Sequence, residues 1–161
     1  TELGQLAKDA PGFLVGGLKQ SQLAFANSKL LHERYFANLG GDGKAQGAVE
    51  RALAQGYGSF ARWEEHFRAL GASLGGGSGW AILCYELGTG LLPSFWSGNH
   101  TQVPAGAEPL LVLDMYEHSY QMDYGAAVAR YLDAFFDNIQ WEEVNRRFEL
   151  AQKAAALLRA T

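Results

Sequence analysis

The spacing of hydrophobic positions changes near residue 80, and the change predicts two kinds of element. Before that point apolar residues recur every three or four positions, which is typical of helices that bury one face. Beyond it come short apolar runs of strand length, and helical spacing then returns. These elements predict an α+β fold, with a helical N-terminal part followed by a three-stranded antiparallel sheet flanked by helices. The predicted helices span residues 21–38, 47–55, 59–70, 126–136 and 141–158, and the predicted strands span residues 80–87, 91–96 and 110–113.

Glycine and proline mark the expected ends of the N-terminal elements. A helix over residues 2–9 is expected to stop at Pro11-Gly12, and Gly16-Gly17 is expected to break any continuation. Residues 39–43, Leu-Gly-Gly-Asp-Gly, end the first long helix. Ser59 is placed to cap a later one. We therefore expect two parts, an N-terminal helical part over residues 1–43 and a C-terminal part over residues 44–161.

Composition limits the function classes. The chain has 161 residues, of which 48% are hydrophobic and 19% charged, so it can bury the core of one ordinary domain. A net charge of −4 argues against a nucleic-acid surface. No apolar run approaches the ~18 residues that a membrane span needs. Cys84 is the single cysteine, which excludes an internal disulfide. The first residue, Thr1, is not methionine, and we interpret the sequence as entered partway along a chain.

The strongest candidate chemistry follows the last predicted strand. The apolar run Leu110–Leu113 is followed at once by Asp114, and His118 comes four residues later. An unpaired carboxylate beside a buried strand is costly, and a metal ion bound by both side chains would remove that cost. The simpler alternative is a solvated strand end with an Asp–His hydrogen bond, because a four-residue Asp–His spacing is unspecific by itself.

The other three histidines have ordinary interpretations when each is taken alone. His32 shares a face of its predicted helix with Phe25 and Phe36, which favours a histidine packed in the core or at an interface. His66 belongs to a charged helix face and is expected to be exposed. His100 lies in a polar loop after a strand, where a surface position is expected.

Residues 114–124 read Asp-Met-Tyr-Glu-His-Ser-Tyr-Gln-Met-Asp-Tyr. This segment resembles the Asp-x-[Trp/Tyr]-Glu-His-[Ala/Ser]-Tyr-x-x-Asp-Tyr signature of the iron/manganese superoxide dismutase family. Further matches to that family follow in the same order along most of the chain. They are His-Glu-Arg-Tyr-Phe-Ala-Asn-Leu at residues 32–39, Tyr-Gly-Ser-Phe at 57–60, Gly-Ser-Gly-Trp at 77–80, and Tyr-Leu-Asp-Ala-Phe-Phe-Asp-Asn-Ile-Gln-Trp at 131–141.

The resemblance implies a redox metalloenzyme. Such an enzyme is a superoxide dismutase, an antioxidant oxidoreductase that converts superoxide to oxygen and hydrogen peroxide with one iron or manganese ion per chain. His32, Asp114 and His118 take the positions of three of the four protein ligands of the metal. Because the ligand sets for the two metals are the same, the sequence does not distinguish iron from manganese.

The resemblance also implies roles around the metal. His100 takes the position of an outer residue that hydrogen-bonds the metal-bound solvent. Trp80 and Tyr116 resemble an aromatic wall over the metal. Glu117 resembles a residue that crosses a two-fold interface to the last ligand of the partner subunit, and Tyr120 belongs to the same region. A homodimer through this region is implied, with neither nucleic acid nor membrane as a partner.

One departure leaves alternatives open. The family's first helix carries the first ligand histidine, but no histidine precedes His32 here, so this helix is absent from the sequence as given and the helical hairpin is incomplete. A non-catalytic subunit of a larger assembly, or another metalloenzyme such as a hydrolase with three ligands, are the alternatives. Cytoplasm and mitochondrial matrix are both consistent with this interpretation.

Overall fold

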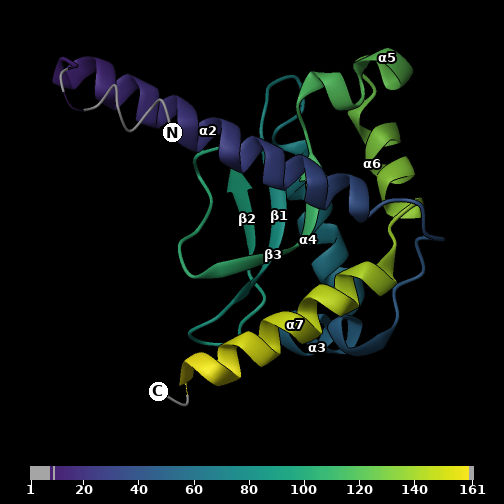
Figure 1. The fold of residues 1–161 in the computed structure, drawn as a ribbon. Helices are drawn as coiled ribbons and strands as arrows, with labels where there is room; N and C mark the ends of the chain where they lie inside the picture. The colour runs from purple at the N-terminus through teal and green to yellow at the C-terminus, as the bar shows by residue number, and fades with distance from the viewer. Residues whose placement is uncertain (1–7, 9, 160–161) are drawn as a thin grey trace.

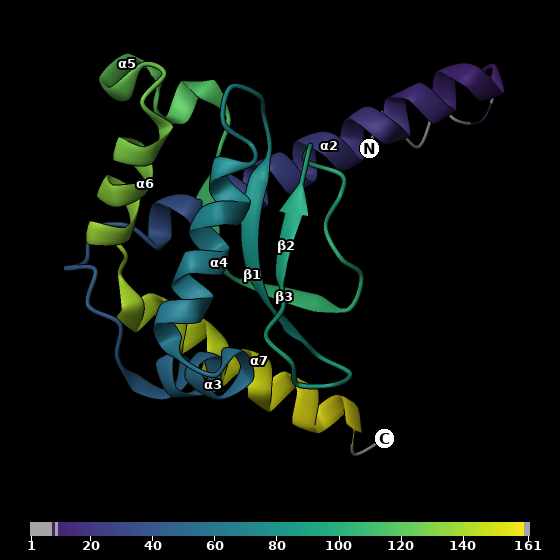
Figure 2. The same cartoon turned by 180° about the vertical axis from the view of Figure 1, so that it is seen from behind.

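The computed structural model describes residue 8 and residues 10–159, in which a three-stranded sheet lies between two layers of helices. Figures 1 and 2 show helices α2 and α7 on one face of the sheet and helix α4 on the other. This arrangement confirms the predicted α+β fold. In chain order the elements are α2 (Gly12–Ala37), α3 (Gly47–Tyr57), α4 (Phe60–Ala72), β1 (Trp80–Glu86), β2 (Ser94–Ser97), β3 (Ala107–Asp114), the 3-10 helix η1 (Glu117–Ser119), α5 (Gln121–Tyr124), α6 (Val128–Asp137) and α7 (Trp141–Arg159).

Strand β1 lies in the middle of the sheet, with β2 and β3 antiparallel to it on either side. Helices cover both faces, and β1 is therefore buried along nearly its whole length instead of alternating between apolar and polar residues. In the register of the sheet Trp80 lies opposite Asp114, the last residue of β3. The first residue of β1 is thus placed beside the carboxylate of the candidate site.

Helix α2 begins at Gly12, earlier than the sequence predicts. The expectation that Gly16-Gly17 breaks helical structure is wrong, because α2 runs through both glycines. Proline just before a helix has a φ angle suited to its start, and an interior glycine costs only about 1 kcal/mol. The helix expected over residues 2–9 lies, apart from Lys8, outside the described residues.

Strand β3 begins at Ala107, inside the segment that the sequence predicts to be a loop. Pro109 lies within this strand, opposite Cys84 and next to a bulge between Leu83 and Cys84. Because β3 is at the edge of the sheet, the missing N–H of proline is tolerated there. Strand β2 is shorter than predicted and covers only Ser94–Ser97.

An aromatic cluster joins α4 to α7. Trp63 and Phe67 of α4 are fully buried, and the ring of Trp63 lies 5.4 Å from that of Phe67 and 5.7 Å from that of Trp141 at the start of α7. The predicted cap of α4 is confirmed, because the side chain of Ser59 accepts the N–H of Arg62 at 3.2 Å. Burial of each such ring stabilises the fold by about 1.5–3 kcal/mol.

The C-terminal end of α2 is tied to two other parts of the fold. Asn38, the residue after α2, is fully buried, and its side-chain oxygen accepts the N–H of Val112 in β3 at 2.9 Å. Its backbone carbonyl accepts the N–H of Gln140, just before α7, at 2.9 Å. These bonds place the last turns of α2, which include His32, across β3.

The two longest helices, α2 and α7, have 26 and 19 residues. Figure 1 shows the N-terminal part of α2 projecting beyond the sheet at the upper left. In the part of the chain that the structure describes, no helix combines the length and the apolar character that would let it cross a membrane.

Candidate metal centre

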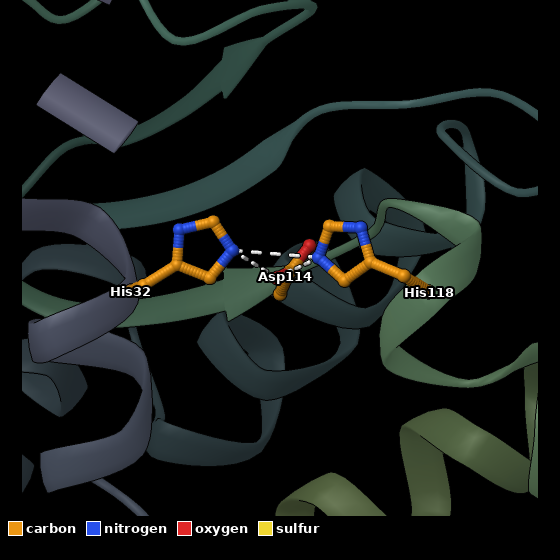
Figure 3. Close-up of side chains that lie close together, drawn as sticks. All are labelled: His32, Asp114 and His118. Carbon is orange, nitrogen blue, oxygen red and sulfur yellow. Dashed lines mark hydrogen bonds and ion pairs between the residues drawn. The ribbon is translucent and has the colours of Figure 1, made fainter. Parts of the chain in front are cut away.

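Three side chains from separate elements meet beside the end of β3. His32 comes from α2, Asp114 is the last residue of β3, and His118 comes from η1. Figure 3 shows the two imidazole rings directed toward each other and toward the carboxylate of Asp114. Asp114 and His118 follow His32 in the sequence by 82 and 86 positions (114 − 32 and 118 − 32). The position of His32 on α2 and the short turn after β3 bring the three residues together.

The ligand atoms of the three side chains lie within 4.8 Å of one another. Asp114 Oδ2 is 3.5 Å from His32 Nε2 and 3.2 Å from His118 Nε2. The two Nε2 atoms are 3.4 Å apart. Two imidazole nitrogens and a carboxylate oxygen form a donor set that suits iron, manganese or zinc.

The hydrogen bonding of His32 indicates which of its ring nitrogens can bind a metal ion. Its Nδ1 lies 2.7 Å from the backbone carbonyl of Ser28, which can only accept, and we therefore assign the proton of the neutral ring to Nδ1. The lone pair of Nε2 then faces the carboxylate oxygen of Asp114, which is another acceptor. A cation among these atoms removes the repulsion between the two acceptors, so the residues fit a metal ion.

Burial dominates the electrostatics of Asp114. Its side chain is 1% exposed, and burial raises its pKa, while the N–H of Tyr116, at 2.9 Å from Oδ1, and the nearby His118 and His32 act in the opposite direction. The structure describes no lysine or arginine in an ion pair with this carboxylate. A metal ion is the partner that would hold it ionised.

An aromatic group borders the three donors, and it contains three of the residues to which the resemblance gives roles around the metal, Trp80, His100 and Tyr116. Trp80 is fully buried, and its ring meets that of His32 edge-on at 4.9 Å. Its indole N–H donates to His100 Nδ1 at 3.0 Å. The ring of Tyr116 is stacked on that of His100 at 4.8 Å and on that of His118 at 5.5 Å.

Glu117, the first residue of η1, and Tyr120, directly after η1, lie outside this aromatic group. Glu117 is exposed, whereas Tyr120 is 3% exposed and its hydroxyl accepts the N–H of Gly76 at 3.2 Å. Both residues line a cavity of about 350 Å³ that also reaches Gln121. No partner chain is present, and the interface role of these two residues stays a prediction. His66 is exposed on α4, as expected.

A pair of buried tyrosines, to which the resemblance gives no role, lies behind Asp114. The hydroxyl of Tyr131 donates to the backbone carbonyl of Asp114 at 2.7 Å and lies 3.1 Å from the hydroxyl of Tyr35. Burial raises the pKa of both tyrosines. A tyrosine on an apolar helix face needs a hydrogen-bond partner for its hydroxyl. From the sequence alone, this requirement predicts a buried hydrogen bond for Tyr131 but not its partner.

The comparisons with known proteins agree with this geometry. Residues 45–147 match the family described as iron/manganese superoxide dismutases, C-terminal domain. Over 142 residues, the chain is 48% identical to a superoxide dismutase [Fe] of Cupriavidus metallidurans, which covers 88% of this chain and 72% of the relative. It is 35% identical over 126 residues to superoxide dismutase [Mn] 2 of Haloferax volcanii, and 36% identical over 125 residues to a superoxide dismutase [Mn] of Corynebacterium diphtheriae.

The chain therefore belongs to the iron/manganese superoxide dismutase family. The Haloferax and Corynebacterium alignments cover 76% of this chain but only 61% and 62% of those relatives. The chain thus spans less than two thirds of the length of several curated relatives. Neither the geometry nor the comparisons favour the non-catalytic or hydrolytic alternatives.

Proposed function

We propose that this chain binds one iron or manganese ion through His32, Asp114 and His118 and disproportionates superoxide to oxygen and hydrogen peroxide. The observation that carries the proposal is the meeting of two Nε2 atoms and a buried carboxylate oxygen within 4.8 Å in a member of this family. A bound ion of either metal supplies the one-electron change between the +3 and +2 states that the reaction needs.

His32 and Asp114 are held in place before any ion binds. The carbonyl of Ser28 fixes the ring orientation of His32 and leaves its Nε2 free. Asp114 is held at its backbone carbonyl by the hydroxyls of Tyr131 and Ser119, at 2.7 and 2.9 Å. Two ligands that keep their orientation bind a cation with a smaller loss of conformational entropy.

We assign His100 the role of a proton donor next to the three ligands. The indole N–H of Trp80 can only donate, so His100 Nδ1 accepts and the proton of the neutral ring lies on Nε2. Burial lowers the pKa of His100, which favours this neutral form. In this proposal His100 hydrogen-bonds the solvent at the centre and hands on protons, which peroxide must take up to leave. Trp80 and Tyr116 form the aromatic wall that limits the access of bulk water.

We further propose that the functional unit is a homodimer that joins through the region of Glu117 and His118. Glu117 is exposed, and the side chain of His118 remains 59% exposed although its Nε2 faces Asp114. A second subunit that contacted both residues would cover the open side of the centre. The division into residues 1–43 and 44–161 and a location in the cytoplasm or mitochondrial matrix stay predictions.

Metal analysis of purified protein tests the proposal. We expect near-stoichiometric iron or manganese in the wild-type chain, loss of most of that metal in His118→Ala, and superoxide consumption that follows metal content. His66→Ala is the matched control, because His66 is an exposed histidine on α4 away from the three donors. A wild-type chain that takes up neither metal would contradict the proposed function.

A further inference from the structure

A buried arginine on α7 connects the two elements that carry His32 and Asp114. The side chain of Arg147 is 2% exposed. Its Nη2 donates to the backbone carbonyl of Arg34 in α2 at 3.1 Å, and its Nη1 donates to the backbone carbonyl of Leu110 in β3 at 2.9 Å. One rigid guanidinium group therefore contacts α2 two residues after one candidate ligand and β3 four residues before another.

Glu143 holds this guanidinium group in its orientation. Its carboxylate accepts from Arg147 Nε at 2.8 Å and also pairs with Arg146 at 2.6 Å. A buried guanidinium needs a counter-ion, and a fork with three occupied directions has little freedom to rotate. The guanidinium group of Arg147 thus fixes the backbone carbonyls of Arg34 and Leu110 relative to α7.

The packing between α2 and α7 is open where this bond forms. Figure 1 shows the two helices crossing the same face of the sheet. A cavity of about 500 Å³ lies between them, lined by Leu30 and Arg34 of α2 and by Glu143, Arg147 and Leu150 of α7. Close apolar contact does not set the separation of the helices at this point. The hydrogen bond from Arg147 spans the junction instead.

A second link between α2 and β3 is indirect and runs from Tyr35 through the hydroxyl of Tyr131 to the carbonyl of Asp114. The remaining direct links are weaker or more distant from His32. The ion pair of Arg34 with Glu108 is about one third exposed on each side, where such pairs contribute little. Asn38 bonds to β3 only beyond the end of α2. Leu31 packs in the core next to His32, but apolar packing restricts direction less than a hydrogen bond does.

We propose that the Glu143–Arg147 pair is a positioning device for the metal centre, which sets the separation of His32 on α2 from Asp114 on β3. Donor atoms must keep within about 0.5 Å of their working positions for a metal site to retain its affinity and geometry. Arg147 touches neither candidate ligand and acts through the backbones of the two elements. The inference rests on the proposed function, because it concerns the same three donors.

Cobalt(II) titration of the metal-free chain, followed by visible absorption, tests the inference without an activity assay. In Arg147→Lys the ammonium group can pair with Glu143 but cannot reach both carbonyls in the geometry of the fork. We expect this variant to melt close to the wild type, to bind cobalt about tenfold more weakly, and to have an altered ligand-field spectrum. Arg147→Met is expected to lose more affinity and also stability.

Arg68→Met is the matched control, because Arg68 pairs with Glu64 and Asp133 and links α4 to α6. Within the described residues no hydrogen bond or ion pair joins Arg68 to α2 or β3. It is expected to keep the affinity and the spectrum of the wild type. If Arg147→Lys binds cobalt as the wild type does, with the same spectrum, the pair is only structural and the inference is wrong. If the wild type itself binds no cobalt, the proposed function fails as well.

Discussion

The hydroxyl of Tyr131 on α6 donates a 2.7 Å hydrogen bond to the backbone carbonyl of Asp114 at the end of β3. Burial raises the pKa of Tyr131, so the hydroxyl stays protonated and remains a donor. The same hydroxyl lies 3.1 Å from that of Tyr35 on α2, three residues after His32. A chain of two hydrogen bonds therefore connects the helix of one candidate ligand to the backbone of another.

Tyr131→Phe is expected to lower the free energy of unfolding by about 1–3 kcal/mol, because it removes both hydrogen bonds of the Tyr131 hydroxyl. The buried hydroxyl of Tyr35 then lacks this partner, while the carbonyl of Asp114 keeps Ser119 as a donor. Urea unfolding measures the change. Tyr124→Phe is the control, since the Tyr124 ring also packs against Tyr131, at 5.9 Å, and its hydroxyl has no hydrogen bond within the described residues. Equal losses in the two variants would show that the bond to Asp114 contributes nothing.

His100→Ala is expected to destabilise the chain by about 1–3 kcal/mol, since it removes the acceptor that lies 3.0 Å from the indole nitrogen of the fully buried Trp80. His100→Gln keeps a side-chain acceptor and is expected to recover most of the loss. Urea unfolding and the tryptophan emission of the folded state are the measurements. If the glutamine variant is as unstable as the alanine variant, the hydrogen bond to Trp80 is not the cause.

The sequence predicted the residues of the centre better than the connections behind them. Asp114 and His118 are close in sequence and stand in a dense motif, so their meeting could be expected. Trp80 was expected from the resemblance, but its place opposite Asp114 follows from the register of β1 against β3, which no local pattern determines. The contact between Tyr131 and Asp114 joins separate elements and has no sequence spacing to reveal it.

The sequence around Arg147 does indicate that this residue needs a partner. Arg147 falls on the buried face of α7, beside Val144 and Ala151, where a charged side chain is costly unless it is paired.

The wrong prediction at Gly16-Gly17 has a different origin. A glycine inside a helix lowers helix stability by about 1 kcal/mol, and tertiary contacts can outweigh that amount.

Gly41→Ala is expected to destabilise the chain by about 1–3 kcal/mol, because a Cβ there would lie 2.3 Å from the carbonyl oxygen of Ile139 and 2.5 Å from the Cα of Gln140. Both are backbone atoms, so the loop after α2 would have to move away from the start of α7. In Gly56→Ala, the control, a Cβ in α3 meets no atom within 4 Å, and a gain of about 0.5–1 kcal/mol is expected. Thermal and urea unfolding measure both changes, and a neutral Gly41→Ala would contradict the close approach.

Glu143 should make stability depend on pH in the acid range. Hydrogen bonds from Arg146, and then from Arg147, hold the pKa of Glu143 at about 2, below its ordinary value of 4.5. Between these two values the unfolded chain binds a proton that the folded chain does not. The contribution of Glu143 is therefore fully present above about pH 4.5 and is lost as the pH falls toward about 2.

Comparison of the wild type with Glu143→Gln isolates this contribution, because the other carboxylates titrate in both proteins. The difference in the free energy of unfolding is expected to be largest near neutral pH and to shrink steadily below about pH 4.5. Urea unfolding at a series of pH values measures it. Glu142→Gln, at an exposed neighbour without an ion pair in the described residues, is the control and should show no such trend. A difference between wild type and Glu143→Gln that stays constant with pH would mean that the ionised carboxylate is not what holds Arg146 and Arg147.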